Sequence, residues 1–400
     1  MSRRLVLISV TGPDRPGITS RIASVLATHT LPIADIEQVT TGGNLALSFL
    51  VQAPGNADRS HPVFKDLIYA AWELEVHADF RFLEEDTRPH NPRRIYALTV
   101  FGHEICAAAI AGLAEALARQ GVNIDKIHKL SAHTFSCLEL ILSAPDSVGL
   151  QTLKQSLLPL SIEYGMDLAL QRESVYRKAK RLVVLDMDST LTQGEVIDEL
   201  AEKHGVKEQV ARITERAMQG ELDFEEALRQ RVALLEGLTT AELNEVRTHI
   251  TLTPGGHDLL KVLKKLGYRI AVISGGFTYF TDWLKQQLGL DYAYANELEI
   301  REGKLTGKLR GSIVDARRKA DLLETIAQSE GIQLDQVIAV GDGANDLQML
   351  KRAGLGVAFN PKRSLRAAAE HTLDQPQLDA ILYLLGIREH ELHQLLERER

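Results

Sequence analysis

Cysteine is nearly absent from this chain, which has two, Cys106 and Cys137, among 400 residues. This scarcity argues against a disulfide framework, and we expect both side chains to be buried as small hydrophobic groups. No apolar stretch is long enough for a membrane-spanning helix, and the first residues lack the apolar core and cleavage site of a signal peptide. These absences predict a cytoplasmic protein without a membrane partner.

Basic residues are also fewer than acidic residues. The 46 lysines and arginines are outnumbered by 54 aspartates and glutamates, which gives a net charge of -8. Binding to nucleic acid requires clustered cations that displace counterions, so we expect no nucleic-acid partner. With 44% hydrophobic and 25% charged residues, the composition is otherwise that of a soluble globular protein, and its length predicts two or three domains.

Two aspartates follow a short apolar segment in the middle of the chain. Residues 182–185 are an unbroken apolar run, which is typical of a strand buried on both faces of a parallel sheet. Asp186 and Asp188 come next, at the carboxyl end of the strand, where open α/β sheets bind their ligands. One carboxylate there can act as nucleophile and metal ligand while the other exchanges a proton. The alternative interpretation is an acidic turn that caps the next helix.

Two later segments also place polar groups directly after a predicted buried strand. Residues 268–273 lead into Ser274 and two glycines, whose hydroxyl and backbone N–H groups suit a phosphate. Residues 336–340 lead into Gly-Asp342-Gly-Ala-Asn345-Asp, and a carboxylate pair with an amide offers the hard oxygen ligands that magnesium prefers. Between them, a lysine near the start of a predicted helix at 318–329, Lys319, is by itself an ordinary surface residue.

These segments do not match the common nucleotide- or calcium-binding motifs. The third glycine of a dinucleotide fingerprint is replaced by Asp346, and two carboxylates would repel a pyrophosphate. Residues 303–308 are one residue short of a P-loop and lie in a hairpin-like segment. A calcium loop that starts at Asp186 is excluded because Leu191 occupies the position that requires glycine.

The N-terminal 172 residues contain one pattern twice. Predicted strands and helices follow the order β-α-β-β-α-β, the split βαβ arrangement, first to residue 82 and again from residue 95, where 147–158 is the last helix and 161–171 the last strand. A charged segment, 173–180, then leads to the central strand. We expect its cations and the one that follows to cover a solvated helix face without a site of their own: Arg177, Lys178, Lys180 and Arg181.

This doubled region resembles two ACT domains, modules that bind amino acids. The resemblance rests on the turn Asp14-Arg-Pro-Gly17, where Gly17 allows a ligand to approach the N-terminus of the next helix. His103-Glu-Ile-Cys-Ala-Ala108 occupies the corresponding turn of the second copy and has no glycine, so that ligand turn is interpreted as degenerate. A scaffold that only dimerises is the alternative for both copies.

The ordered set D-x-D-x-T, S-G-G, K and G-D-G-x-N-D resembles the haloacid dehalogenase superfamily over roughly residues 181–385. This resemblance implies a doubly wound, Rossmann-like parallel α/β core with a small helical cap, preceded by two α+β, ferredoxin-like ACT domains. The expected domains are residues 1–85, 93–172 and 181–400, with the cap at about 196–252.

The same resemblance implies roles for the residues of each motif. Asp186 is the expected nucleophile, which forms an aspartyl-phosphate, and Asp188 is the expected general acid and base. Ser274 and Gly275 would hold the phosphate, and Lys319 would balance its charge. The expected cofactor is Mg²⁺, with Mn²⁺ as the other possible ion. Its ligands would be Asp186, the backbone carbonyl of Asp188 and Asp342, with Asn345 nearby at the substrate.

Residues 218–231 resemble the part of the family's cap that contacts the substrate, and this resemblance implies further roles. Arg231 would pair with a substrate carboxylate and Glu195 would face an ammonium group, while Met218 and Phe224 would exclude water. The alternative for Arg231 is a helix-surface ion pair with Glu226 or Glu236.

The resemblance therefore implies an enzyme that hydrolyses O-phospho-L-serine to L-serine and phosphate, the last step of serine biosynthesis. L-serine is the expected effector of the ACT domains, and a homodimer is the expected assembly. The alternatives are a capped phosphatase or phosphotransferase for another small phosphomonoester, and a catalytically dead amino-acid sensor.

Overall fold

The computed structural model describes residues 3–54, 58, 60–83, 93–131 and 135–397. The chain divides into two compact units, Met1–Asn91 and Pro92–Arg400. No helix in these described ranges is both long and apolar enough to cross a bilayer.

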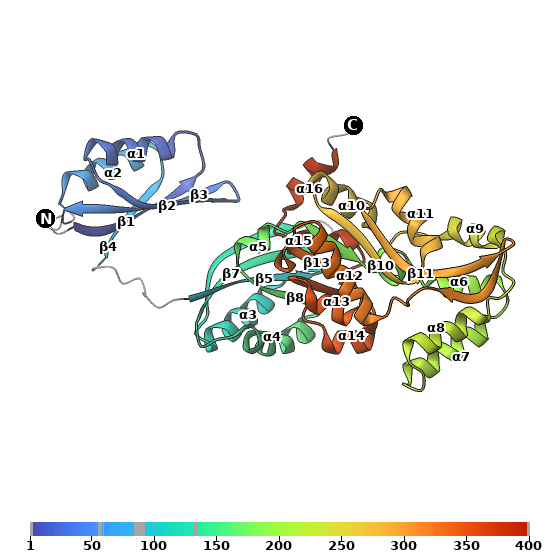
Figure 1. Ribbon diagram of the computed structural model, residues 1–400. Coiled ribbons are helices and arrows are strands. Elements are labelled where there is room, and N and C mark those ends of the chain that lie inside the picture. Colours follow the sequence, from blue (N-terminus) through green and yellow to red (C-terminus); the bar gives the residue numbers. More distant parts are fainter. Residues whose placement is uncertain (1–2, 55–57, 59, 84–92, 132–134, 398–400) are drawn as a thin grey trace. The chain divides into compact units, whose positions relative to one another are not determined.

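The first unit is a four-stranded antiparallel sheet with strand order β2-β3-β1-β4 and two helices on one face (Figure 1). Alternate residues of β3 are buried against α1 and α2, as expected for a sheet with one covered face. The split βαβ prediction is therefore confirmed here. Its elements are β1 (Arg3–Pro13), α1 (Ile18–Thr28), β2 (Ile33–Thr41), β3 (Asn44–Pro54), α2 (Pro62–Glu73) and β4 (His77–Leu83).

The same fold opens the second unit, with strand order β6-β7-β5-β8. One boundary was predicted wrongly: residues 161–164 continue α4 and do not begin the last strand. Gly165, with φ +59°, ends that helix, and the Met166 N–H donates to the carbonyl of Ser161. The elements are β5 (Arg93–Gly102), α3 (Ala107–Arg119), β6 (Asn123–Ser131), β7 (Ser136–Pro145), α4 (Leu150–Tyr164) and β8 (Asp167–Arg172).

The rest of the second unit is built on a seven-stranded sheet with order β12-β11-β10-β9-β13-β14-β15. Six neighbouring strands, β11, β10, β9, β13, β14 and β15, are parallel, and the edge strand β12 is antiparallel to β11. The doubly wound prediction is therefore confirmed. The strands are β9 (Leu182–Leu185), β10 (Arg269–Phe277), β11 (Tyr292–Arg301), β12 (Lys304–Arg310), β13 (Val337–Gly341), β14 (Leu355–Phe359) and β15 (Thr372–Leu373).

Both faces of this sheet are buried, because its central strands β9, β10 and β13 each contain an unbroken run of apolar residues. In β9, Val183 and Leu185 belong to one hydrophobic cluster, whereas Leu182 and Val184 belong to another. The helices that carry these clusters are α10 (Gly256–Lys265), α11 (Thr278–Leu288), α12 (Ala316–Ser329), α13 (Leu347–Arg352), α14 (Arg363–Ala368), α15 (Ile381–Leu384) and α16 (Glu389–Glu397).

A helical insertion leaves the sheet after β9 and returns before α10. Its helices are α6 (Val196–Lys203), α7 (Lys207–Met218), α8 (Phe224–Ala233) and α9 (Thr240–His249). The β11–β12 hairpin supports it, since the Gly237 N–H donates to the carbonyl of Leu305 and the Thr240 N–H to that of Gly303. This insertion is the cap of the predicted fold.

The second ACT-like module and the catalytic sheet share a buried junction. β8 lies against β15, and the Asp167 carboxylate accepts hydrogen bonds from the Asp374 N–H and the Gln375 amide, both at 2.8 Å. Arg366 of α14 in turn pairs with Asp374. Hydrogen bonds and strand contacts therefore connect this module to the C-terminal part of the sheet.

Two predictions about single residues fail in this unit. Arg177 of α5 (Val175–Lys178) and Lys180 are buried, not solvated: Arg177 pairs with Glu139 of β7 and with Glu173, and Lys180 donates to the carbonyl of Asp335. Burial lowers the pKa of Lys180 to about 8. Cys106 is exposed at the N-terminus of α3, because the helix turns its buried face away from that position; Cys137 is buried, as predicted.

Candidate active site

The carboxyl ends of the three central strands meet around Asp186. Leu185 of β9 is paired with Val272 of β10 on one side and with Val340 of β13 on the other. The residues that follow, Asp186, Ser274 and Asp342, consequently emerge at the same edge of the sheet. A tight turn, Met187–Leu191, closes when the Leu191 N–H donates to the carbonyl of Asp186, and it turns the chain back over this edge.

Lys319 reaches this edge from the first turn of α12. Its ammonium nitrogen lies 2.8 Å from Asp186 Oδ1 and 2.7 Å from Asp346 Oδ1, and its side chain is fully buried. Burial alone would lower the pKa of Lys319, but the two carboxylates raise it above its ordinary value. The lysine is therefore a permanent positive charge at the site and not the surface residue that its sequence context suggested.

Asp186 is 4% exposed and accepts a hydrogen bond from the Met187 N–H at 2.7 Å. Burial raises its pKa well above the ordinary value, the charge of Asp346 raises it further, and Lys319 opposes both effects. The carboxylate thus presents an oxygen atom to a region with an excess of negative charge, where an added cation is favoured.

Asp188 and Ser274 flank one backbone position, Gly276. A Cβ atom on Gly276 would lie 2.8 Å from Asp188 Oδ2 and 3.0 Å from Ser274 Oγ, so only glycine fits between them. Burial raises the pKa of Asp188 to about 7, against a hydrogen bond from the Val196 N–H. A carboxyl group with this pKa can hold or release a proton near neutral pH, as a general acid and base must.

Three buried carboxylates gather where a metal ion would fit. Oxygen atoms of Asp186, Asp342 and Asp346 all lie within 4.8 Å of one another. Burial raises the pKa of Asp342, the charge of Lys362 opposes this effect, and the charge of Asp346 adds to it. Clustered, under-neutralised oxygen donors match the preference of Mg²⁺ for hard ligands. The residues present therefore fit the expected ion.

The cap places an aromatic ring against the loop formed by Ser274, Gly275 and Gly276, the expected phosphate loop. A Cβ on Gly275 would lie 3.1 Å from Phe224 Cζ at the start of α8 and 3.9 Å from Asn345 Nδ2. The loop itself is held from behind by Asn296, whose amide donates to the carbonyl of Gly275 at 2.8 Å. Cap, phosphate loop and Asn345 thus meet at one point, where Phe224 can exclude water.

Arg231, in the last turn of α8, is partly buried, and its Nε donates to the carbonyl of Ala227. Burial lowers its pKa, while the charges of Glu195, Asp198 and Asp188 raise it. These acidic neighbours are different from Glu226 and Glu236, the partners expected of a surface arginine. Glu195 also pairs with Lys362 at 2.6 Å, and Lys362 lies 3.3 Å from Asp342.

Two predicted residues have no side-chain geometry to compare. Met218 ends α7, and its side chain lies outside the described part of the chain. Gly17 belongs to the first unit, where it precedes α1 with φ +100° and has open space at the position of a Cβ. The second copy has Cys106 with an ordinary φ of −78° at the corresponding position.

Sequence reasoning missed two residues of this site, Lys362 and Asn296. It included Asp346 only in the carboxylate pair offered to magnesium, whereas its Oδ2 accepts from the Gly343 N–H and its Oδ1 contacts Lys319. Lys362 follows β14, and Asn296 lies within β11. For Lys362 a signal existed, since it follows a fourth apolar strand just as Asp186, Ser274 and Asp342 follow theirs.

Comparison with known proteins supports the two families that the sequence motifs indicated. Residues 183–351 match the haloacid dehalogenase-like hydrolase family, and residues 4–81 and 95–171 each match an ACT domain. Phosphoserine phosphatase of Streptomyces coelicolor is 43% identical over 388 residues, which cover 97% of this chain and 93% of that protein. Phosphoserine phosphatase SerB2 of Mycobacterium tuberculosis is 42% identical and covers 97% of this chain and 94% of its own length.

Solved structures agree. A haloacid dehalogenase family hydrolase of Salmonella enterica superimposes with a TM-score of 0.63 at 31% identity, over 72% of this chain and 98% of its own. A probable phosphoserine phosphatase of Vibrio cholerae, in unliganded form, gives a TM-score of 0.55 at 36% identity, over 74% and 88%.

Proposed function

We propose a reaction from the premise that this chain belongs to the phosphoserine phosphatases of the haloacid dehalogenase-like hydrolase family, with two ACT domains before the catalytic domain. The enzyme hydrolyses O-phospho-L-serine to L-serine and phosphate through an aspartyl-phosphate. One observation carries the catalytic assignment: the buried Lys319 ammonium group lies 2.8 Å from Asp186, beside the carboxylates of Asp342 and Asp346.

In the first step, Asp186 attacks the phosphorus atom and the serine oxygen leaves. Asp188 gives that oxygen its proton, and its raised pKa makes the protonated form available. In the second step, Asp188 takes a proton from water, which attacks the phosphorus of the aspartyl-phosphate and releases phosphate. Asp186 is then regenerated as a carboxylate. Ser274 and the backbone of Gly275 would hold the phosphate oxygens throughout.

Phosphate-monoester hydrolysis is among the slowest uncatalysed reactions. The enzyme therefore has to neutralise the negative charge of the phosphoryl group. Lys319 supplies one fixed positive charge on the Asp186 side of the site. When bound, Mg²⁺ would neutralise charge on the transferring phosphoryl group; Asp186, Asp342 and the backbone carbonyl of Asp188 would hold it, with Asp346 adjacent. Mn²⁺, a similar hard ion, is the alternative.

The direct test is phosphate release from a panel of phosphomonoesters, with and without a chelator. We expect O-phospho-L-serine to be the best substrate by its kcat/KM. We also expect activity to disappear when EDTA removes the ion and to return when excess Mg²⁺ is added. Equal turnover of sugar phosphates would favour the broader capped phosphatase, and no turnover of any ester in the presence of Mg²⁺ would favour the amino-acid sensor.

Substrate selection is assigned to Arg231 and Glu195, which would pair with the carboxylate and ammonium groups of phosphoserine. Replacing Arg231 with alanine is expected to lower kcat/KM for phosphoserine about 100-fold, since a charge-assisted, bidentate pair is lost. Turnover of an aryl phosphate, which has no carboxylate, should change much less. The matched control is Arg229→Ala on the same helix, where the arginine is exposed and pairs with Glu225. Equal losses for both substrates would rule out a carboxylate clamp.

Amino-acid sensing is assigned to the first ACT domain. The left-handed backbone at Gly17 leaves free N–H groups at the N-terminus of α1 beside open space, which suits a carboxylate. Calorimetric titration of the full chain with L-serine is expected to show saturable binding, and Gly17→Val should weaken it by adding a branched side chain to this space. Unchanged binding in that variant would place the effector elsewhere.

A cytoplasmic homodimer remains our expectation for the assembly.

A further inference from the structure

The expected phosphate loop, residues 274–276, lies at an irregularity of the catalytic sheet. β10 and β11 pair residue by residue up to Ile273 and Tyr294, and the next pair is Phe277 with Asn296. Residues 274–276 of β10 therefore face a single residue of β11 and bulge out of the ladder. The backbone of a buried bulge needs hydrogen-bond partners from outside the ladder.

Asn296, which is 2% exposed, supplies one of these partners. Its Nδ2 donates to the carbonyl of Gly275, and its Oδ1 accepts from the Val314 N–H, both at 2.8 Å. Because a backbone N–H can only donate, the bond from Val314 fixes which end of the amide faces the loop. Val314 directly precedes Asp315, the N-cap of α12, so the amide is anchored at the start of the helix that carries Lys319.

The peptide group between Gly275 and Gly276 is held at both ends. Asn296 binds its carbonyl, and its N–H, which belongs to Gly276, donates to Ser274 Oγ at 2.8 Å. A hydroxyl oxygen that accepts this bond directs its own hydrogen elsewhere, and among the residues that the structure describes none accepts that hydrogen. The buried Ser274 hydroxyl is thereby left as a donor for a phosphate oxygen.

On the basis of the proposed function, in which Ser274 holds the phosphate, we propose that Asn296 is a positioning residue for phosphate binding. It orients the Ser274 hydroxyl through the peptide between residues 275 and 276 and does not itself contact the ligand. The hydrogen bonds run in series, from the amide to the peptide, from the peptide to Ser274 and from Ser274 to the phosphate, so each strengthens the next. At neutral pH an amide supplies both a donor and an acceptor, whereas a carboxylate of the same size supplies only acceptors.

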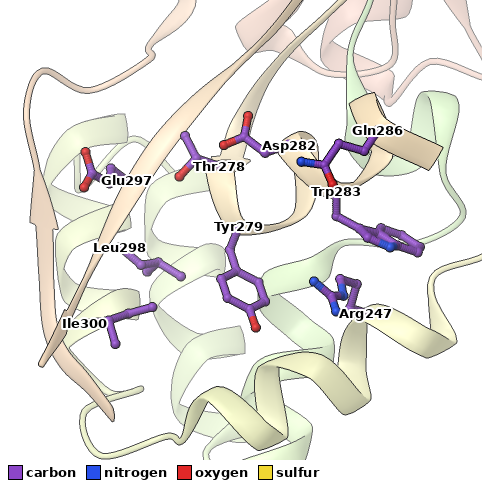
Figure 2. Close-up of a pocket in the computed structure, with 9 residues that line it drawn as sticks. All are labelled: Arg247, Thr278, Tyr279, Asp282, Trp283, Gln286, Glu297, Leu298 and Ile300. Carbon is purple, nitrogen blue, oxygen red and sulfur yellow. The ribbon is translucent and has the colours of Figure 1, made fainter. Parts of the chain in front are cut away.

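The first test is Asn296→Ala in the full chain. It should lower kcat/KM at least about tenfold for both O-phospho-L-serine and p-nitrophenyl phosphate, because the loop serves the phosphate that the two esters share. The inhibition constant of inorganic phosphate should rise in parallel, and thermal melting in EDTA checks the fold. The control is Glu297→Ala on the same strand, an exposed side chain that lines a separate pocket between α9, α11 and β11 (Figure 2) and should leave these constants unchanged.

A double-mutant cycle tests whether Asn296 acts through Ser274. In a Ser274→Ala background the hydroxyl group is absent, so adding Asn296→Ala should lower kcat/KM by less than about threefold. The inhibition constant of inorganic phosphate should follow the same pattern. A full additional loss in that background, or a loss for O-phospho-L-serine alone, would overturn the proposal.

Asn296→Asp covers the case in which the alanine variant does not fold. It keeps the size of the side chain and the bond from Val314, but it can donate to the Gly275 carbonyl only when protonated. Because burial raises the pKa of the introduced carboxyl group, the ratio of variant to natural kcat/KM should rise as the pH falls from about 8 to about 6. A ratio that stays low over this range would overturn the proposal. Hydrolysis of p-nitrophenyl phosphate but not of O-phospho-L-serine by the natural chain would contradict only the proposed substrate, because the loop serves both esters.

Discussion

Replacing Asp186 with asparagine is expected to reduce phosphoserine turnover by about 10⁴-fold or more, because the reaction loses its nucleophile. The fold should persist. Asparagine can still accept the hydrogen bonds that Met187 and Lys319 donate to the carboxylate. In the absence of a divalent ion the variant should melt no lower than the natural protein, since burial and Asp346 already raise the pKa of Asp186 and disfavour its charged form.

Two measurements check this expectation. Phosphate release reports turnover, and thermal melting in EDTA reports the fold. Asp321→Asn, which changes a partly exposed aspartate of α12, is the matched control and should retain full activity. Near-normal phosphate release from the Asp186 variant would refute its role as nucleophile, whatever the melting temperature.

Replacing Lys319 with methionine is expected to affect both stability and catalysis. Two buried carboxylates, Asp186 and Asp346, would lose the cation between them, and breaking a buried ion pair typically lowers the free energy of unfolding by about 3–5 kcal/mol. Turnover should fall by about 10³-fold, as when another preorganised charge-stabilising donor is removed. Urea unfolding in EDTA and phosphate release in Mg²⁺ measure the two effects separately.

A double variant separates the two effects if the single variant folds poorly. Adding Asp346→Asn removes the carboxylate that Lys319 held, so much of the stability should return while turnover stays low. The exposed Lys351→Met on α13 is the control for loss of a lysine and should change neither property. Wild-type turnover in the double variant would show that Lys319 serves only to neutralise Asp346.

The sequence predicted the central part of this site because the ends of its buried strands can be recognised from the pattern of apolar and polar residues. Residues 182–185, 270–273 and 337–340 are apolar without interruption, and a polar side chain follows each of them within two residues. Parallel strands bring such groups to one edge, so the convergence of Asp186, Ser274 and Asp342 needed only that the three strands be neighbours. The family resemblance then supplied an assignment for Lys319.

The missed features depend on contacts between segments far apart in the chain. The sequence around Arg177 predicts a surface residue, because its partner Glu139 lies on a distant strand of the second ACT-like module. Lys362 is one lysine among many until β14 carries it to Glu195 and Asp342. Asp346 acquires its position from a short turn that folds its carboxylate beneath Gly341, where a Cβ atom would lie 2.4 Å from it. Local patterns contain none of these partners.

The junction between β8 and β15 connects the second ACT-like module to the catalytic site through a chain of side-chain contacts. Asp167 holds the backbone of Asp374, and Asp374 holds Arg366 of α14. That helix begins directly after Lys362, whose ammonium group lies between Glu195 and Asp342. These contacts form a continuous chain from β8 to the carboxylates of Glu195 and Asp342, through which we expect a displacement of β8 to reach the catalytic site even with an empty ligand turn.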